Sequence, residues 1–248
     1  MLIDPSAYRH HPELAARIVD PSESFFRDLN LAELDQRMIE NGRGPDWRYP
    51  DTVREAMRAR TLTGREGQPL WVFGYGSLMW DPGFLFDEVR HGIAQGFSRS
   101  MCLVDRFGAR GSPDAPGLMA GLAEGGSCEG LVFRIPPELV ARESEIVWRR
   151  EMIAHAYRAV FVPVDTAQGR VEALAFVADE TAENIDVAVP REVQIGYIAT
   201  GQGMRGTSLE YLEKMLQQFH ALEVEDPMLE GLLRDVRARI AAISQATP

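Results

Sequence analysis

The first segment whose residue types could do chemistry is a glycine-rich turn, Phe73-Gly74-Tyr75-Gly76-Ser77-Leu78. It continues the apolar run Leu70–Phe73, which is typical of a buried strand that ends at a tight turn. Glycines allow successive backbone N–H groups to point into one concavity, and such a concavity binds anionic oxygens. Ser77 would add a hydroxyl there. The spacing alone nevertheless favours the plainer interpretation, an ordinary glycine-rich turn.

Glu151 is the second candidate. On a helix it follows Trp148 by three residues and Val147 by four, so its carboxylate would lie beside apolar side chains. Loss of hydration raises a carboxyl pKa from about 4.3 toward neutrality, which suits a group that exchanges protons near pH 7. The alternative is a solvated glutamate paired with Arg149 or Arg150. Because most helical glutamates are solvated, the pattern by itself favours this alternative.

Gly201-Gln202-Gly203-Met204-Arg205-Gly206 is formally a GxGxxG motif. A dinucleotide-binding fold needs this turn after the first strand of a βαβ unit, with more sheet to follow. Only helix-like sequence follows here, and Thr207 and Glu210 have the spacing of a capping box. The motif therefore predicts a helix start and not a nicotinamide site.

Metal and hydrolase chemistry receive little support from the sequence. Glu151 and His155 are four residues apart, but no third ligand cluster accompanies them. The segment around Ser77 lacks the glycine that would complete a GxSxG nucleophile elbow. We therefore expect no metal and no cofactor.

Composition sets the broad class. The 248 residues include 26 Lys and Arg against 37 Asp and Glu, for a net charge of −11, and 45% are hydrophobic. This apolar content can fill a core, and an acidic chain without a basic block is a poor ligand for nucleic acid or an anionic membrane. The two cysteines, Cys102 and Cys128, make no CxxC pair. We expect a cytoplasmic protein with reduced thiols, whose oligomeric state stays open.

The elements that must position these residues are of mixed type. Two helices are expected within the first 68 residues, one from Asp20 to Asn41 and one from Asp51 to Gly64. From Pro69 the sequence becomes rich in strands. We expect them at 70–73, 89–102, 130–135, 157–164 and 171–177, the last two as a hairpin, and helices at 138–155, 194–200, 207–220 and 227–240. Without regular βαβ alternation, this order favours an α+β fold.

Taken together, these segments resemble the ChaC-like γ-glutamylcyclotransferases. Val72 to Trp80 resembles the opening signature of that family. Further stretches occur in the family's order: Arg110 to Pro113 with Pro116 to Leu118, Gly125 to Gly130, Trp148 to Met152, Ile198 to Gly201, and Glu210 to Leu212. The resemblance covers about residues 69 to 236 and leaves the first 68 residues unexplained.

The resemblance implies a small mixed β-barrel with flanking helices. We therefore divide the chain into a helical N-terminal extension, residues 1–68, and a γ-glutamylcyclotransferase-like domain, residues 69–248. It also implies a lyase-type reaction, the cleavage of glutathione to 5-oxoproline and Cys-Gly. Alternatives are cleavage of other γ-glutamyl amines or amides, or a binding module without turnover.

By the same resemblance, Glu151 would be the acid/base. The loop Tyr75-Gly76-Ser77-Leu78 would hold the γ-glutamyl group. With the end of the preceding strand, the expected substrate-binding residues are Val72, Phe73, Gly74, Tyr75, Gly76, Ser77 and Leu78. The expected partner is a small-molecule substrate, glutathione or another γ-glutamyl compound. We expect no nucleic acid, membrane, metal or cofactor.

Overall fold

The computed structural model describes residues 3–246, which form two compact units. Unit 1 contains residues 3–99 and 122–182, and unit 2 contains residues 100–121 and 183–246. The chain passes from one unit to the other three times: within the long strands β2 (Glu88–Asp105) and β3 (Gly117–Ile135), and between Ala182 and Glu183.

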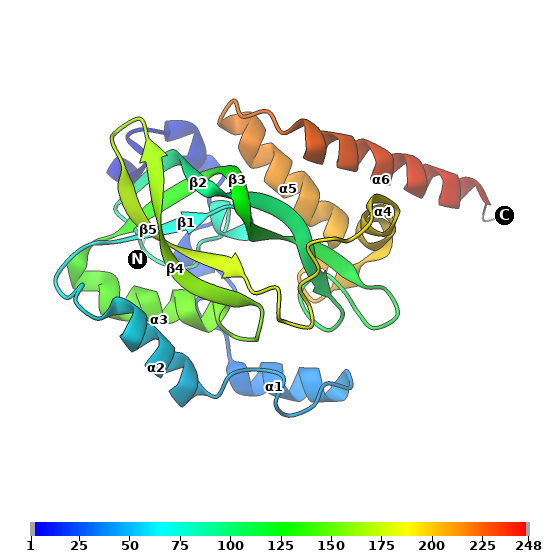
Figure 1. Ribbon diagram of the computed structural model, residues 1–248, viewed down its shortest axis with the longest axis horizontal. Coiled ribbons are helices and arrows are strands. Elements are labelled where there is room, and N and C mark those ends of the chain that lie inside the picture. Colours follow the sequence, from blue (N-terminus) through cyan, green and yellow to red (C-terminus); the bar gives the residue numbers. More distant parts are fainter. Residues whose placement is uncertain (1–2, 247–248) are drawn as a thin grey trace. The chain divides into compact units, whose positions relative to one another are not determined.

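Five strands close into a barrel in the order β1-β3-β2-β4-β5 (Figure 1). Besides β2 and β3 these are β1 (Leu70–Gly74), β4 (Tyr157–Thr166) and β5 (Val171–Ala178). β1 is antiparallel to β3 and parallel to β5, and β4 and β5 form the expected hairpin. The α+β class and the small mixed barrel are thus confirmed. Closure pairs each strand of this barrel with a neighbour on both sides.

The barrel of unit 1 holds an apolar core. Its buried members are Phe73, Tyr75, Ala94, Leu122, Cys128, Val132, Val162, Val164, Ala173, Ala175 and Val177. They come from all five strands and from the turn after β1, so packing in the barrel fixes the position of that turn.

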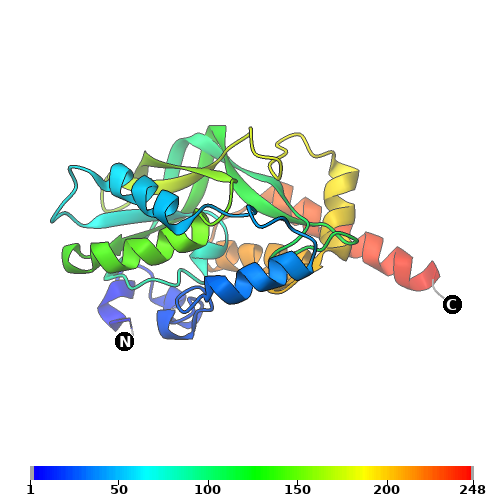
Figure 2. The ribbon, with the colours of Figure 1, turned by 90° about the horizontal axis from the view of Figure 1, so that it is seen from below.

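Helix α3 (Val140–Glu151) covers the barrel of unit 1, and α2 (Asp51–Leu62) lies beside it (Figures 1 and 2). The Arg58 guanidinium of α2 donates to the Ser144 hydroxyl of α3 at 2.7 Å. Helix α2 begins at the expected Asp51 and ends at Leu62, two residues before Gly64, whereas α3 is shorter than the expected 138–155.

The helix expected from Asp20 to Asn41 is only partly present. Asp20 caps a single 3₁₀ turn, Pro21–Glu23, and the α-helix α1 spans Leu31–Glu40. It begins where the Asn30 side chain accepts hydrogen bonds from the N–H groups of Ala32 and Glu33. The intervening residues are drawn into contacts with the rest of unit 1, and such tertiary contacts override a weak helical period.

Unit 2 contains the three expected C-terminal helices, α4 (Arg191–Thr200), α5 (Ser208–Ala221) and α6 (Pro227–Ala246). The GxGxxG segment forms two short strands, β6 (Gln202–Gly203) and β7 (Gly206–Thr207), and leads into α5. A capping box joins Thr207 and Glu210 there, as the spacing predicts.

Within unit 2 the stretch from Arg110 to Gly117 has a packing role. A side chain at Gly111 would lie 1.8 Å from the Asp105 carbonyl oxygen, so only glycine fits. The buried Arg110 guanidinium donates to the Thr207 carbonyl at 3.2 Å. None of the helices among residues 3–246 has the length and apolar character needed to cross a membrane.

Candidate active site

The glycine-rich loop leaves the barrel at the end of β1. After Gly74 the chain turns through a 3₁₀ segment, Ser77–Met79, in which the Met79 N–H donates to the Gly76 carbonyl at 2.9 Å. A Cβ at Gly74 would lie 2.9 Å from the Leu78 Cβ. Glycine is therefore required for the loop to fold back closely on the end of its strand.

Most side chains of the predicted loop point into the protein. Val72 and Phe73 are fully buried, and Leu78 is buried as well. The Tyr75 hydroxyl donates to the Phe176 carbonyl of β5 at 2.7 Å, which ties the loop to the barrel wall. Ser77 is only partly buried, so its hydroxyl is the side-chain group of this loop best placed for a ligand.

Glu151 is the last residue of α3, and 14% of its side chain is exposed. Trp148 and Val147, one turn earlier, are buried as the helical spacing predicts. Burial raises the pKa of the Glu151 carboxyl, and the neighbouring Arg150 opposes this rise without cancelling it. The C-terminal end of a helix dipole also disfavours a negative charge. Glu151 is therefore a desolvated carboxyl that keeps some access to solvent.

Arg150 connects Glu151 to the loop. Its Nε lies 2.8 Å from the Glu151 carboxylate, and its Nη2 donates to the Ser77 hydroxyl at 2.7 Å. A single guanidinium thus brings together the predicted acid/base and the predicted binding loop, all within unit 1. From the sequence alone Arg150 is expected only as a partner for a solvated glutamate, and no local motif indicates its contact with Ser77.

The arrangement suits proton transfer beside an anchored anionic substrate. A desolvated carboxyl can accept and return a proton near neutral pH. Backbone N–H groups and a hydroxyl at the loop can hold a carboxylate or stabilise a developing oxyanion. The pairing with Arg150 keeps one carboxylate oxygen in a fixed direction.

His155 does not share a site with Glu151 in the described contacts. Its ring packs on that of Tyr49, with centroids 3.9 Å apart. Within residues 3–246, no group of three or more His, Cys, Asp or Glu side chains is arranged to hold a metal ion.

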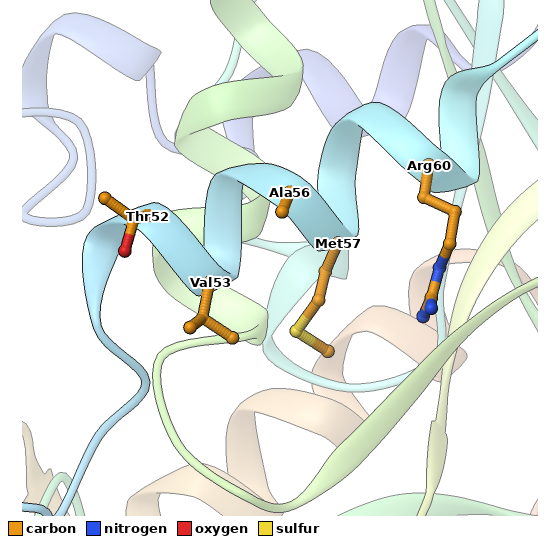
Figure 3. Close-up of a pocket in the computed structure, with 5 residues that line it drawn as sticks. All are labelled: Thr52, Val53, Ala56, Met57 and Arg60. Atoms are coloured by element: carbon orange, nitrogen blue, oxygen red, sulfur yellow. The ribbon is translucent and has the colours of Figure 1, made fainter.

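A hollow of about 410 Å³ lies on the outer face of α2 (Figure 3). Its lining residues all come from that helix: Thr52, Val53, Ala56, Met57 and Arg60. None is a predicted site residue, so this hollow is a surface feature of the N-terminal segment and separate from the loop and Glu151.

Known proteins with similar sequences place the chain in a family. A model of the ChaC-like protein family matches residues 70–239. The glutathione-specific γ-glutamylcyclotransferase of Escherichia coli (strain K12) is 36% identical over 190 residues, which cover 76% of this chain and 82% of that protein. The glutathione-specific γ-glutamylcyclotransferase 1 of Rattus norvegicus is 32% identical over 173 residues, or 67% of this chain and 78% of that protein.

The fold agrees with a solved structure. A crystal structure of a glutathione-specific γ-glutamylcyclotransferase from yeast superposes with a TM-score of 0.62 at 20% identity, covering 68% of this chain and 96% of that one. Together with the family match over residues 70–239, these similarities show that the chain belongs to the ChaC-like protein family.

Proposed function

We propose that this chain is a γ-glutamylcyclotransferase that cleaves glutathione to 5-oxoproline and Cys-Gly, with Glu151 as the acid/base. The observation that carries the proposal is the desolvated Glu151 carboxyl, which Arg150 joins to the hydroxyl of Ser77. The curated relatives, named as glutathione-specific γ-glutamylcyclotransferases, support the choice of substrate.

The reaction needs no external nucleophile. In a γ-glutamyl amide the α-amine is already tethered to its target carbonyl, and closing a five-membered ring requires only the correct folded rotamer. Glu151 takes a proton from the α-amine of the substrate as the amine nitrogen attacks the γ-carbonyl carbon. The bond from that carbon to the leaving nitrogen then breaks, and Glu151 returns the proton to the departing amine of Cys-Gly.

The loop supplies binding. Backbone N–H groups around Gly76 and Ser77 anchor the α-carboxylate or the oxyanion of the tetrahedral intermediate, each good donor contributing a few kcal/mol. The residues buried behind them hold the loop in shape: Val72, Phe73, Gly74, Tyr75 and Leu78. We also place the enzyme in the cytoplasm, where Cys102 and Cys128, both buried thiols, would stay reduced.

The test is an assay of purified protein with glutathione and, separately, with γ-glutamyl amines and γ-glutamyl dipeptides, following 5-oxoproline by mass spectrometry. We expect release from glutathione, with Cys-Gly in equal amount. Release only from another donor would keep the chemistry and change the substrate. No release from any donor by a folded protein would contradict the proposal and favour a binding module.

A further inference from the structure

The Arg150 guanidinium occupies the centre of a buried network in unit 1. Only 3% of its side chain is exposed, so a substrate does not reach it directly. Besides Ser77 and Glu151, it donates to the backbone carbonyl of Asp81, which follows the loop. Its fourth neighbour is the Phe26 ring, whose centroid lies 4.0 Å from the guanidinium carbon.

Phe26 belongs to a segment outside the part of the chain that the family model matches. This segment is fixed at several points. The Ser24 hydroxyl donates to the Asp81 carboxylate at 2.6 Å. Arg27 forms a bidentate ion pair with the buried Glu143 of α3, its Nη1 and Nη2 donating to the two carboxylate oxygens at 2.8 and 3.0 Å. Both ends of the Arg150 network, the loop and α3, are therefore held by the same stretch of the N-terminal segment.

We propose that Arg150 is a positioning residue that holds Ser77 and Glu151 in register, with Phe26 of the N-terminal segment as the platform that fixes its guanidinium. The inference rests on the proposed role of Glu151 as acid/base. It gives part of the segment 1–68 a function in the reaction, as a component of the site's supporting structure.

Two properties of arginine are needed here. The planar fork donates in several directions at once, whereas a lysine ammonium is a compact point charge. The positive charge also favours the ionised form of Glu151, since an opposite charge at hydrogen-bond distance lowers a carboxyl pKa. Among residues 3–246, Arg150 is the charged group that the structure places against this carboxylate.

The experiment compares Arg150→Met, Arg150→Lys and Phe26→Leu with wild type, measuring kcat, KM and the pH dependence of kcat for 5-oxoproline release from glutathione. Arg170→Met is the control. Arg170 lies in the turn between β4 and β5, its side chain is 66% exposed, and its partner Asp165 does not belong to the Arg150 network. Circular dichroism and thermal unfolding establish that each variant is folded.

In Arg150→Met we expect the acidic limb of the kcat profile to move to higher pH by about one unit or more, because the partner charge is lost. Turnover should fall by roughly 10²-fold, the cost of misplacing a reacting group by about 1 Å. In Arg150→Lys the acidic limb of the kcat profile should return to its wild-type position. KM should be about ten-fold above that of wild type, since one ammonium does not replace the several donors of the guanidinium. Phe26→Leu should lower kcat without moving the limb.

A folded Arg150→Met whose acidic limb and KM equal those of Arg170→Met would overturn the inference. If Arg150→Met does not fold, a folded Arg150→Lys with wild-type KM overturns it equally. Failure of the proposed function is distinguishable from this result. Failure of the activity would appear as no 5-oxoproline release by the wild-type protein, and failure of the Glu151 assignment as near-normal turnover of Glu151→Gln, which leaves Arg150 in place.

Discussion

The ion pair between Arg27 and Glu143 offers a sharp test of how the N-terminal segment is attached. Glu143 is completely buried, and only 13% of the Arg27 side chain is exposed. The carboxylate accepts two hydrogen bonds from Arg27 and a third from the Leu85 N–H at 2.8 Å. Arg27→Met removes two of these three donors. The buried charge then keeps only the Leu85 N–H and the exposed Arg142 guanidinium, whose Nε lies 3.9 Å away.

The expected cost of Arg27→Met is about 3–5 kcal/mol in the free energy of unfolding, the range for breaking one side of a buried pair. Glu143→Gln in the same background removes the stranded charge while its amide oxygen still accepts from Leu85. The double variant should therefore be more stable than Arg27→Met alone by at least about 1 kcal/mol.

Urea unfolding followed by circular dichroism measures these differences, and hydrogen exchange over residues 20–30 reports detachment of the segment. Arg170→Met is the control, because Arg170 pairs with Asp165 at 2.6 Å on an exposed hairpin and surface pairs contribute little. Equal stability of Arg27→Met and Arg170→Met, with unchanged exchange, would refute the reasoning.

Three further predictions concern the site and its supports. Because burial raises the folded-state pKa of Glu151, its ionisation destabilises the native protein as pH rises from the unfolded pKa through the folded one. The free energy of unfolding of Glu151→Gln, relative to that of wild type, should therefore increase as the pH rises from 4 to 8. Urea titrations measure it, and a difference that stays constant over this range would contradict the prediction. Gly130→Ala would put a Cβ 2.4 Å from the Gly74 carbonyl oxygen and should cost about 1–3 kcal/mol, lowering 5-oxoproline release as well. Gly196→Ala, where a Cβ has open space within α4, should be neutral or stabilising by up to about 1 kcal/mol, so equal thermal shifts in the two variants would refute the packing argument. Thr207→Ala removes half of the capping box of α5 and should cost about 1 kcal/mol, and an unchanged denaturation midpoint would contradict the assigned cap.

Strong local patterns were predictable from the sequence. The β4–β5 hairpin, α2 and the three C-terminal helices follow from periodicity and turn residues. In these cases local preference and tertiary packing agree. For Glu151 the helical spacing left two interpretations open and by itself favoured a solvated glutamate, whereas the structure shows the carboxyl with a raised pKa beside the buried Trp148 and Val147.

Features that depend on distant partners were not predictable. The sequence indicates a strand at 130–135, whereas β3 runs from Gly117 to Ile135. Its first part has weak alternation, includes Gly125 and Gly126, and is held by pairing within the barrel. The course of residues 24–27 and the reach of Arg150 to Ser77 depend likewise on groups 50 or more residues away.

The most direct test of the central claim compares Glu151→Gln with Glu145→Gln, an exposed glutamate on the same helix, in 5-oxoproline release from saturating glutathione. We predict that turnover falls by about 10²–10⁴-fold in Glu151→Gln and stays at the wild-type level in Glu145→Gln. Glutathione binding, measured by calorimetry, should be largely retained in both. A folded Glu151→Gln protein with near-normal turnover would contradict the assignment of Glu151 as the acid/base.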